Sequence, residues 1–228
     1  MRLQILNHKL TLIACALFFA AQTARPGTIS GSVRAKGKEV TDSAQPGGLY
    51  ASRKFKFVER TDYDSMHDFV VYIEGPLAGA KPPEQPVKVV QRDAAFVPHI
   101  VPVMAGTTVI WPNEDEVFHN VFSKSQASPF NLGLYKKNDP PRSVVFDKPG
   151  EVDVFCSIHA NMSCVVLVLE NPCFAATDSK GHYAITNVPA GTYKLTAWQE
   201  RLFSRTQDIT VPESGDVKAD FVLGPDAK

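Results

Sequence analysis

A cysteine, a histidine and a methionine follow one another at three-residue intervals in the stretch DVFCSIHANMSC. Cys156, His159 and Met162 offer a thiolate, an imidazole and a thioether, which are all groups that bind metals. Copper accepts soft sulfur donors as well as nitrogen, whereas zinc makes little use of a thioether. The spacing therefore favours a copper site, although a cysteine at the end of a strand is also often a small buried hydrophobic side chain.

A trigonal site of one thiolate and two imidazoles needs a second histidine. His119 lies upstream in VFHNVF, a run that is typical of a strand. We expect neighbouring strands to bring His119 to the loop that carries the other candidate ligands. Asn120 is expected to hydrogen-bond across to that loop and hold the two segments in register. An apolar shell that excludes water from the site is predicted from Phe118, Val121, Phe155 and Ile158.

The elements that must position these side chains are predicted to be strands. No stretch shows a sustained apolar period of 3.6 residues, whereas short β-branched and aromatic runs recur between turn signals. The sequence therefore predicts an all-β protein. Its predicted strands cover residues 28–33, 69–74, 87–91, 107–111, 118–123, 143–146, 152–155, 165–169, 183–186, 192–198, 206–211 and 217–223.

Proline-containing stretches divide the chain. Prolines 82, 83 and 86 precede the middle region, and Asn171-Pro172 follows the apolar run VVLVLE. We therefore expect an N-terminal β region with a loop over residues 25–86, a central domain over 87–170 and a C-terminal domain over 171–228. Residues 27–75 could pack with the central domain or complete the C-terminal one, and the sequence leaves both open.

The first 24 residues have the features of a cleaved secretory signal peptide. Arg2 and Lys9 lie in a basic start, residues 10–21 are almost wholly apolar, and small residues follow. The apolar run is shorter than the roughly 20 residues that a membrane-spanning helix needs. We expect a periplasmic or secreted mature chain with no transmembrane segment. A lipid anchor at Cys15 is less favoured, because apolar residues continue past this cysteine.

The charge balance gives no indication of a nucleic-acid partner. The chain has 24 basic and 24 acidic side chains, and loss of the signal peptide leaves a small acidic excess. Three cysteines remain, an odd number for an oxidising compartment. Cys164 is expected to pack beneath the metal site. A bridge from it to Cys173 would need a bend, because nine extended residues span roughly 30 Å.

Two segments, GTTVIWPNEDEVFHNVFS and VVFDKPGEVDVFCSIHANM, resemble the cupredoxins, the small blue copper proteins. The similarity covers about residues 87–170, and the short ligand loop is most similar to that of amicyanin. Exported cupredoxin-like proteins linked to methylamine utilisation share several of these features. The resemblance implies a Greek-key β-sandwich that binds one type 1 copper, with His119, Cys156 and His159 as equatorial ligands and Met162 as the weak axial ligand.

One residue departs from the amicyanin-like pattern. Ile158 stands where such loops usually have a proline before the second histidine, so this loop is expected to be less rigid. Ligation itself does not need that proline.

The segment FAATDSKGHYAITNVPAGTYKLTAWQE resembles the carboxypeptidase regulatory-like domain, a small transthyretin-like β-sandwich. Its pattern G-x-Y-x-I-x-x-V-P-x-G-x-Y-x-L sets turns between alternating strands. The early GTISGSV and VVYIEG resemble the opening strands of the same family. This resemblance implies an accessory or docking module rather than a catalytic domain.

These observations lead to one main hypothesis and two alternatives. The main hypothesis is an exported type 1 copper protein that carries single electrons between a redox donor and an acceptor, and not an enzyme. The alternatives are a copper-storage or copper-delivery protein, and a structural β-sandwich interaction protein without physiological copper. Residues 114–116, all acidic, could steer a basic partner or form a solvated turn, while His99 and His182 are expected to be structural or surface histidines.

Overall fold

A computed structural model describes residues 26–37, 62–213 and 215–225. The predicted signal peptide, Cys15 and residues 38–61 lie outside the described residues. Within the described ranges the protein consists of strands, turns and loops without a helix, which confirms the all-β prediction. Accordingly, this part of the chain contains no helix with the length and apolar character needed to cross a membrane.

The described residues form eighteen strands. They are β1 (Gly27–Ala35), β2 (Val70–Ile73), β3 (Val87–Lys88), β4 (Val90–Arg92), β5 (Ala95–Val97), β6 (Ile100–Met104), β7 (Thr107–Trp111), β8 (His119–Ser123), β9 (Phe130–Tyr135), β10 (Arg142–Phe146), β11 (Gly150–Phe155), β12 (Ser163–Leu169), β13 (Phe174–Ala176), β14 (His182–Val188), β15 (Gly191–Gln199), β16 (Leu202–Val211), β17 (Asp216–Lys218) and β18 (Phe221–Leu223).

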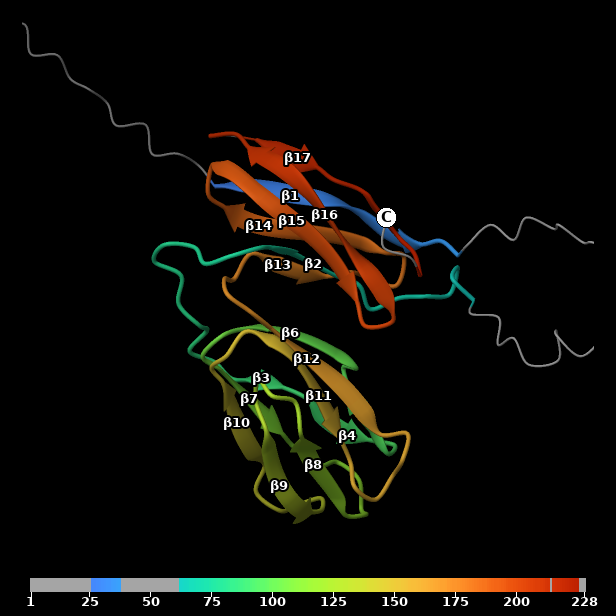
Figure 1. The fold of residues 1–228 in the computed structure, drawn as a ribbon. Helices are drawn as coiled ribbons and strands as arrows, with labels where there is room; N and C mark the ends of the chain where they lie inside the picture. Colours follow the sequence, from blue (N-terminus) through green and yellow to red (C-terminus); the bar gives the residue numbers. More distant parts are fainter. Residues whose placement is uncertain (1–25, 38–61, 214, 226–228) are drawn as a thin grey trace, which may run out of the picture.

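The strands build two β-sandwiches that are stacked on each other (Figure 1). In the central sandwich, made of β3–β12, the sheet β10-β7-β3 faces the sheet β6-β12-β11-β8-β9. In the terminal sandwich, the sheet β14-β1-β17, with β18 also on β1, faces the sheet β13-β2-β15-β16. The first and last described strands thus both lie in the terminal sandwich, and the central sandwich is formed between β2 and β13.

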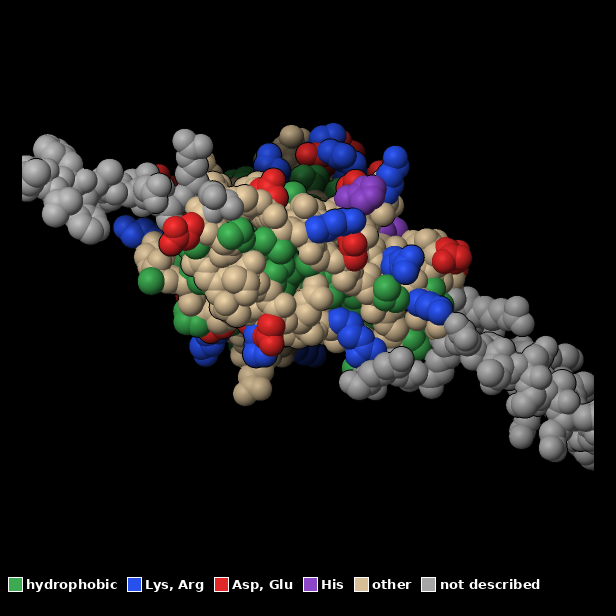
Figure 2. Space-filling model, turned by 90° about the horizontal axis from the view of Figure 1, so that it is seen from above, with side chains coloured by type: hydrophobic (Ala, Val, Ile, Leu, Met, Phe, Trp, Pro, Cys, Tyr) green, Lys and Arg blue, Asp and Glu red, His purple; other side chains and the backbone are tan. Residues whose placement is uncertain are grey.

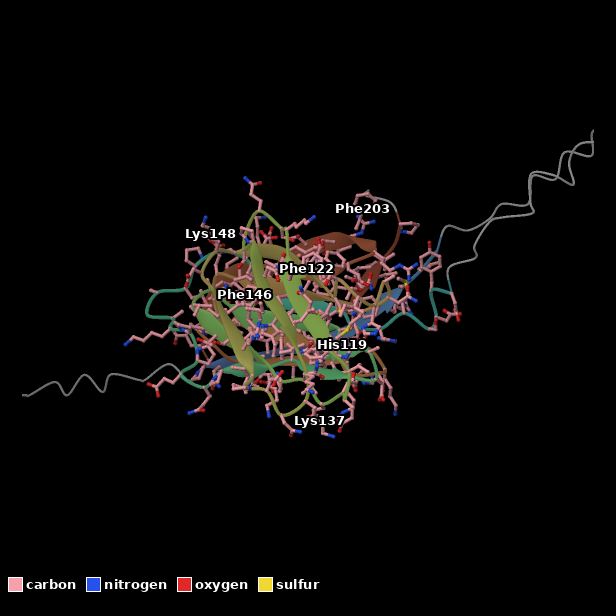
Figure 3. The ribbon with its side chains drawn as sticks, turned by 90° about the horizontal axis from the view of Figure 1, so that it is seen from below. His119, Phe122, Lys137, Phe146, Lys148 and Phe203 are labelled. Atoms are coloured by element: carbon pink, nitrogen blue, oxygen red, sulfur yellow. The ribbon has the colours of Figure 1, made fainter. Side chains whose placement is uncertain are left out.

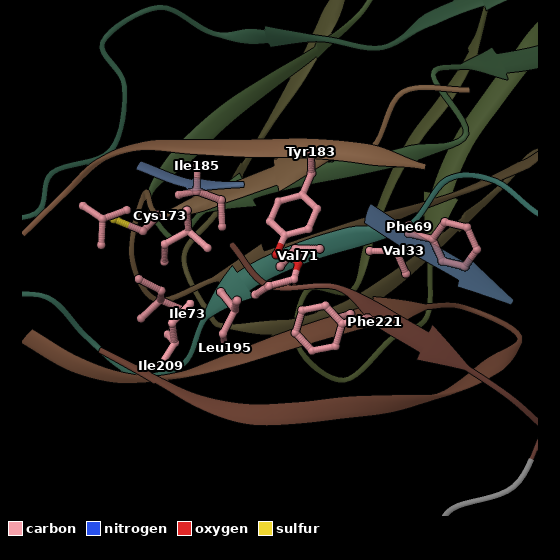
Figure 4. Close-up of a cluster of buried hydrophobic side chains, with 14 of the residues drawn as sticks. Val33, Phe69, Val71, Ile73, Cys173, Tyr183, Ile185, Leu195, Ile209 and Phe221 are labelled. Atoms are coloured by element: carbon pink, nitrogen blue, oxygen red, sulfur yellow. Dashed lines mark hydrogen bonds between the residues drawn. The ribbon is translucent and has the colours of Figure 1, made fainter. Parts of the chain in front are cut away.

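The N-terminal strands β1 and β2 belong to the terminal sandwich, so residues 27–35 and 70–73 pack with the C-terminal strands. Strand β1 pairs with β14 and runs parallel to β17 and β18, and β2 lies between β13 and β15. Alternate residues of β1 and β2 point into one apolar core together with those of β14 and β15 (Figure 4). The core includes Ile29, Val71, Tyr183 and Leu195.

Strand β12 is buried on both faces, which explains why its sequence VVLVL is apolar without alternation. Cys164, Val166 and Val168 point into the core of the central sandwich. The residues between them, Val165 and Leu167 among others, form a second cluster with side chains of the terminal sandwich. Because successive side chains of a strand point to opposite faces, β12 contributes to the core and to the contact between the sandwiches at once.

The crossing from the central to the terminal sandwich is fixed by one buried amide. The side chain of Asn171 donates hydrogen bonds to the backbone carbonyls of Ile73 (2.7 Å) and Gly75 (2.6 Å). Its oxygen accepts the N–H of Cys173 at 2.8 Å. The Asn171-Pro172 break that the sequence shows is therefore a turn tied to the end of β2.

The outer face of the terminal sandwich carries charges of both signs. Figure 2 shows basic and acidic side chains interspersed over it, with small apolar areas between them. Such mixing produces no strong field of a single sign.

We predict that Leu167→Ala destabilises the protein by about 2–5 kcal/mol, because it leaves a cavity in the contact between the sandwiches. The free energy of unfolding from urea denaturation measures this. Val222→Ala is the matched control, since Val222 is 42% exposed and a surface change should stay within about 0.5 kcal/mol. Equal effects of the two substitutions would contradict a packed contact at Leu167.

Candidate metal centre

The loop between β11 and β12 carries three of the predicted ligands, and β8 carries the fourth. Strands β11 and β12 pair along their length, so the loop between them is a hairpin connection at one end of the sandwich. The N–H of Cys156 donates to the carbonyl of Met162 (3.0 Å), and the N–H of Met162 donates to the carbonyl of His159 (3.1 Å). These bonds close the loop and turn its ligands toward the strand that carries His119.

The donor atoms of His119, Cys156 and His159 converge. All three lie within 4.8 Å of one another. The two Nδ1 atoms of the histidines are 3.1 Å apart, and the Cys156 Sγ is 3.8 Å from the Nδ1 of His159. In the described part of the chain, this is the one cluster of three or more such side chains close enough to share an ion.

These separations suit a single metal ion. One ion could contact all three donors, because zinc and similar ions bind histidine nitrogen at about 2.0 Å and thiolate sulfur at about 2.3 Å. Met162 is 1% exposed and belongs to the same buried cluster as Cys156. The site therefore fits the donor set of a His₂Cys copper centre with a nearby methionine.

The backbone N–H of Asn120 lies 3.5 Å from the Sγ of Cys156 and points to it. The predicted link between the two ligand segments is therefore present, but the backbone makes it. The side chain of Asn120 instead donates to Asn131 on β9 (3.3 Å). A hydrogen bond to a cysteine sulfur withdraws electron density from it, and this favours the reduced state of a metal bound there.

A carboxylate holds the far side of His119. The Nε2 of His119 donates to the Oδ2 of Asp115 at 2.8 Å, and the His119 side chain is fully buried. Burial raises the pKa of Asp115, but hydrogen bonds from Ala94, His119 and Asp93 outweigh it and leave the pKa below its ordinary value. Asp115 is therefore an ionised partner that leaves the Nδ1 of His119 to face the site.

A second buried group stabilises the wall next to His119. Tyr135 pairs with His119 across β8 and β9. Its hydroxyl donates to the carbonyl of Trp111 (2.6 Å) and accepts from the side chain of Gln91 (2.6 Å). Burial raises the pKa of Tyr135 to about 12. The tyrosine therefore remains neutral, and the wall of the site has fixed geometry.

The predicted apolar shell is correct for one of its four residues. Val121 is fully buried, but Phe118, Phe155 and Ile158 are 49%, 42% and 51% exposed. Phe118 precedes β8, Phe155 lies on the outer face of β11, and Ile158 lies at the tip of the ligand loop. The prediction failed for these three because it was based on nearness to a ligand in the sequence. Alternation within β11 turns Val152 and Val154 inward and Phe155 outward. Phe118 and Ile158 lie outside the strands. Figure 3 shows His119 enclosed among the strands, with Lys137 projecting at the edge.

The remaining candidates have structural roles. Cys164 is 1% exposed in the core, as predicted, and both it and Cys173 are free thiols. The two nitrogens of His99 contact the carbonyl of Ser163 (3.0 Å) and the carboxylate of Glu200 (3.1 Å), so His99 links the two sandwiches. His182 contacts Asp178 in an exposed turn.

The three acidic residues before β8, residues 114–116, have different contacts. Glu114 pairs with Arg92 and Glu116 with Lys137, both at the surface. Asp115 points inward to His119, a role that sequence reasoning missed. Its spacing of four residues before a candidate histidine was the available signal, but the same spacing is common in solvated turns.

Comparisons with known proteins match only parts of the chain. Residues 174–219 match the family model for polysaccharide lyase family 4, domain II, a description that differs from the carboxypeptidase regulatory-like resemblance of the sequence. The curated proteins contain no match to the chain.

The chain is similar to parts of several solved structures, three of which are named here. A purple cupredoxin from Nitrosopumilus maritimus is 24% identical, with a TM-score of 0.33, over 36% of this chain and 98% of that one. Amicyanin from Paracoccus versutus is 29% identical, with a TM-score of 0.34, over 45% and 99%. A copper-containing nitrite reductase from Thermus scotoductus is 31% identical, with a TM-score of 0.36, over 42% of this chain and only 25% of that one.

We predict that Cys164 resists alkylation in the folded protein at pH 8. Burial raises the pKa of this thiol, so little reactive thiolate is present. Mass spectrometry after treatment with iodoacetamide should find Cys164 unmodified in the native protein and modified in urea. Rapid labelling of Cys164 in the folded state would contradict its place in the core.

Proposed function

We propose that the protein is an exported type 1 copper protein that carries single electrons between a donor and an acceptor. The observation that carries this proposal is the convergence of His119, Cys156 and His159, with donor atoms within 4.8 Å at the end of a β-sandwich. His119, Cys156, His159 and Met162 would hold the ion. Copper supplies one-electron chemistry through its two common oxidation states.

The donor set favours copper over zinc. Structural zinc sites are commonly completed by four cysteine or histidine ligands, whereas this site offers two histidines, one cysteine and a buried methionine. A trigonal His₂Cys set with a weak axial methionine is typical of blue-copper electron-transfer sites. The buried side chains of His119 and Met162 are held by strand pairing and loop hydrogen bonds, so little rearrangement of the protein is needed when an electron enters or leaves.

The exposure of the ligands supports electron exchange at one edge of the site. His119 is fully buried, whereas His159 is half-buried in the loop. Ile158 and Phe118, each next to a ligand in the sequence, are exposed apolar side chains. An apolar surface beside a half-buried ligand would allow close, short-lived contact with redox proteins. Export is proposed from the N-terminal signal-like segment of the sequence.

We predict that the mature protein turns intensely blue with Cu(II) and that Cys156→Ser abolishes the colour, because the intense absorption requires a copper–thiolate bond. Optical titration with Cu(II) measures both. Cys164→Ala is the matched control. Cys164 is also a buried cysteine of the same core, but it is not one of the three converging side chains His119, Cys156 and His159. A colourless wild-type complex, or an unchanged colour in Cys156→Ser, would contradict the proposal.

Copper delivery is the second candidate, because three of the four ligands lie in one short loop whose other residues are exposed. Such a loop could exchange its ion with another protein.

We predict fast, reversible one-electron exchange in cyclic voltammetry for the carrier, with copper retained through many cycles. Irreversible waves, together with transfer of Cu(I) to a chelator-like acceptor protein, would support delivery instead.

A further inference from the structure

The carboxylate of Asp115 makes three hydrogen bonds that fix its position. Its Oδ2 accepts from the Nε2 of His119 (2.8 Å) and from the N–H of Ala94 (3.0 Å), and its Oδ1 accepts from the N–H of Asp93 (2.9 Å). The side chain is 16% exposed. A carboxylate that accepts from three N–H groups cannot rotate without losing at least one of them, so its orientation toward His119 is set from both sides.

A tight turn supplies the two backbone donors. Strands β4 and β5 form a hairpin, and its turn residues Asp93 and Ala94 both have a φ of 54°. In this left-handed conformation both N–H groups point to the same side of the turn, where they meet the two oxygens of Asp115. The backbone of Asp115 is also held, because its N–H donates to the side chain of Asn113 (2.8 Å) and its carbonyl accepts from Lys137 (3.1 Å).

The contact decides which nitrogen of His119 carries hydrogen. A carboxylate only accepts hydrogen bonds, so the Nε2 of His119 must be the donor. In the neutral imidazole the other nitrogen then has a free lone pair. That nitrogen, Nδ1, is the atom that faces His159 at 3.1 Å. Asp115 therefore selects the tautomer that can bind a metal and fixes the plane of the ring.

We propose that Asp115 is a positioning residue of the metal centre, which orients His119, stabilises its metal-binding tautomer and lowers the reduction potential of the bound copper. This inference rests on the proposed function. A carboxylate that accepts the second N–H of a histidine ligand makes the ligand more basic. A more basic ligand stabilises Cu(II) more than Cu(I), because Cu(II) has the higher charge.

The test compares two substitutions at Asp115 with a neighbouring control. Asp115→Asn keeps the size of the side chain and removes the charge, and Asp115→Ala also removes the acceptor. Glu114→Gln removes one charge from the adjacent residue, whose carboxylate pairs with Arg92 at the surface and does not touch His119. Urea denaturation of each variant confirms folding before the metal is studied.

For Asp115→Asn we expect Cu(II) affinity to fall about 10- to 100-fold, as for other partners of metal-binding histidines. Each tenfold loss specific to Cu(II) raises the potential of this one-electron couple by about 59 mV. Cyclic voltammetry and competition with a Cu(II) chelator measure the two quantities. A shift in Asp115→Asn no larger than that in Glu114→Gln would overturn the proposal.

A second readout needs no copper. Nitrogen-15 NMR of the histidine rings in the metal-free, full-length protein distinguishes the two tautomers. We expect the Nε2–H tautomer of His119 in the wild type and in Glu114→Gln, and a mixture of both tautomers in Asp115→Ala. A single unchanged tautomer in Asp115→Ala would overturn the role of Asp115. Failure of the wild type to bind copper would overturn the proposed function, while the NMR result would still decide what Asp115 does.

Discussion

The burial of β12 on both faces is the constraint on which the rest of the structure depends. Its inner side chains complete the core of the central sandwich, and its outer side chains join that sandwich to the terminal one. The strand begins at Ser163, directly after Met162. The same packing that joins the two sandwiches therefore also anchors one end of the ligand loop.

A hydrogen-bonded polar lining holds the candidate metal centre inside this apolar frame. His119, Asn120 and Gln91 are buried polar residues of the central sandwich, and their contacts run to Asp115, to the cysteine sulfur and to Tyr135. Buried polar groups are costly unless they are paired. These hydrogen bonds therefore hold the candidate ligands in place, because moving a ligand would break a hydrogen bond and leave a buried polar group without its partner.

The strands of the terminal sandwich lie on both sides of the central sandwich in the sequence, but they come together on one side of it in space. Strands β1 and β2 come from one end of the chain and β13–β18 from the other, and Figure 1 shows them together on one side of the central sandwich. Asn171 and the cluster around Trp198 fix this arrangement. His99 extends this arrangement to the end of the ligand loop, because its ring contacts the carbonyl of Ser163 on one side and the carboxylate of Glu200 on the other.

The sequence by itself predicted most strands, because alternation and β-branched runs are local signals; residues 107–111 form β7 with the same ends. It missed β5, β6, β9 and β13, which are short or contain Pro102 or Gly133, residues that weaken a strand pattern. It also identified three side chains that the structure brings together, since His119, Cys156 and His159 were chosen by residue type and spacing and their donor atoms lie within 4.8 Å of one another.

Only the tertiary structure decided which partners these residues have. Contacts between distant segments bring His119 to the ligand loop and turn Asp115 inward beside two outward-facing glutamates. Such contacts also place residues 27–35 and 70–73 in the terminal sandwich. The physical reason is that side-chain type and spacing act locally, whereas strand pairing and burial join segments whose separation along the chain carries no information about their distance in space.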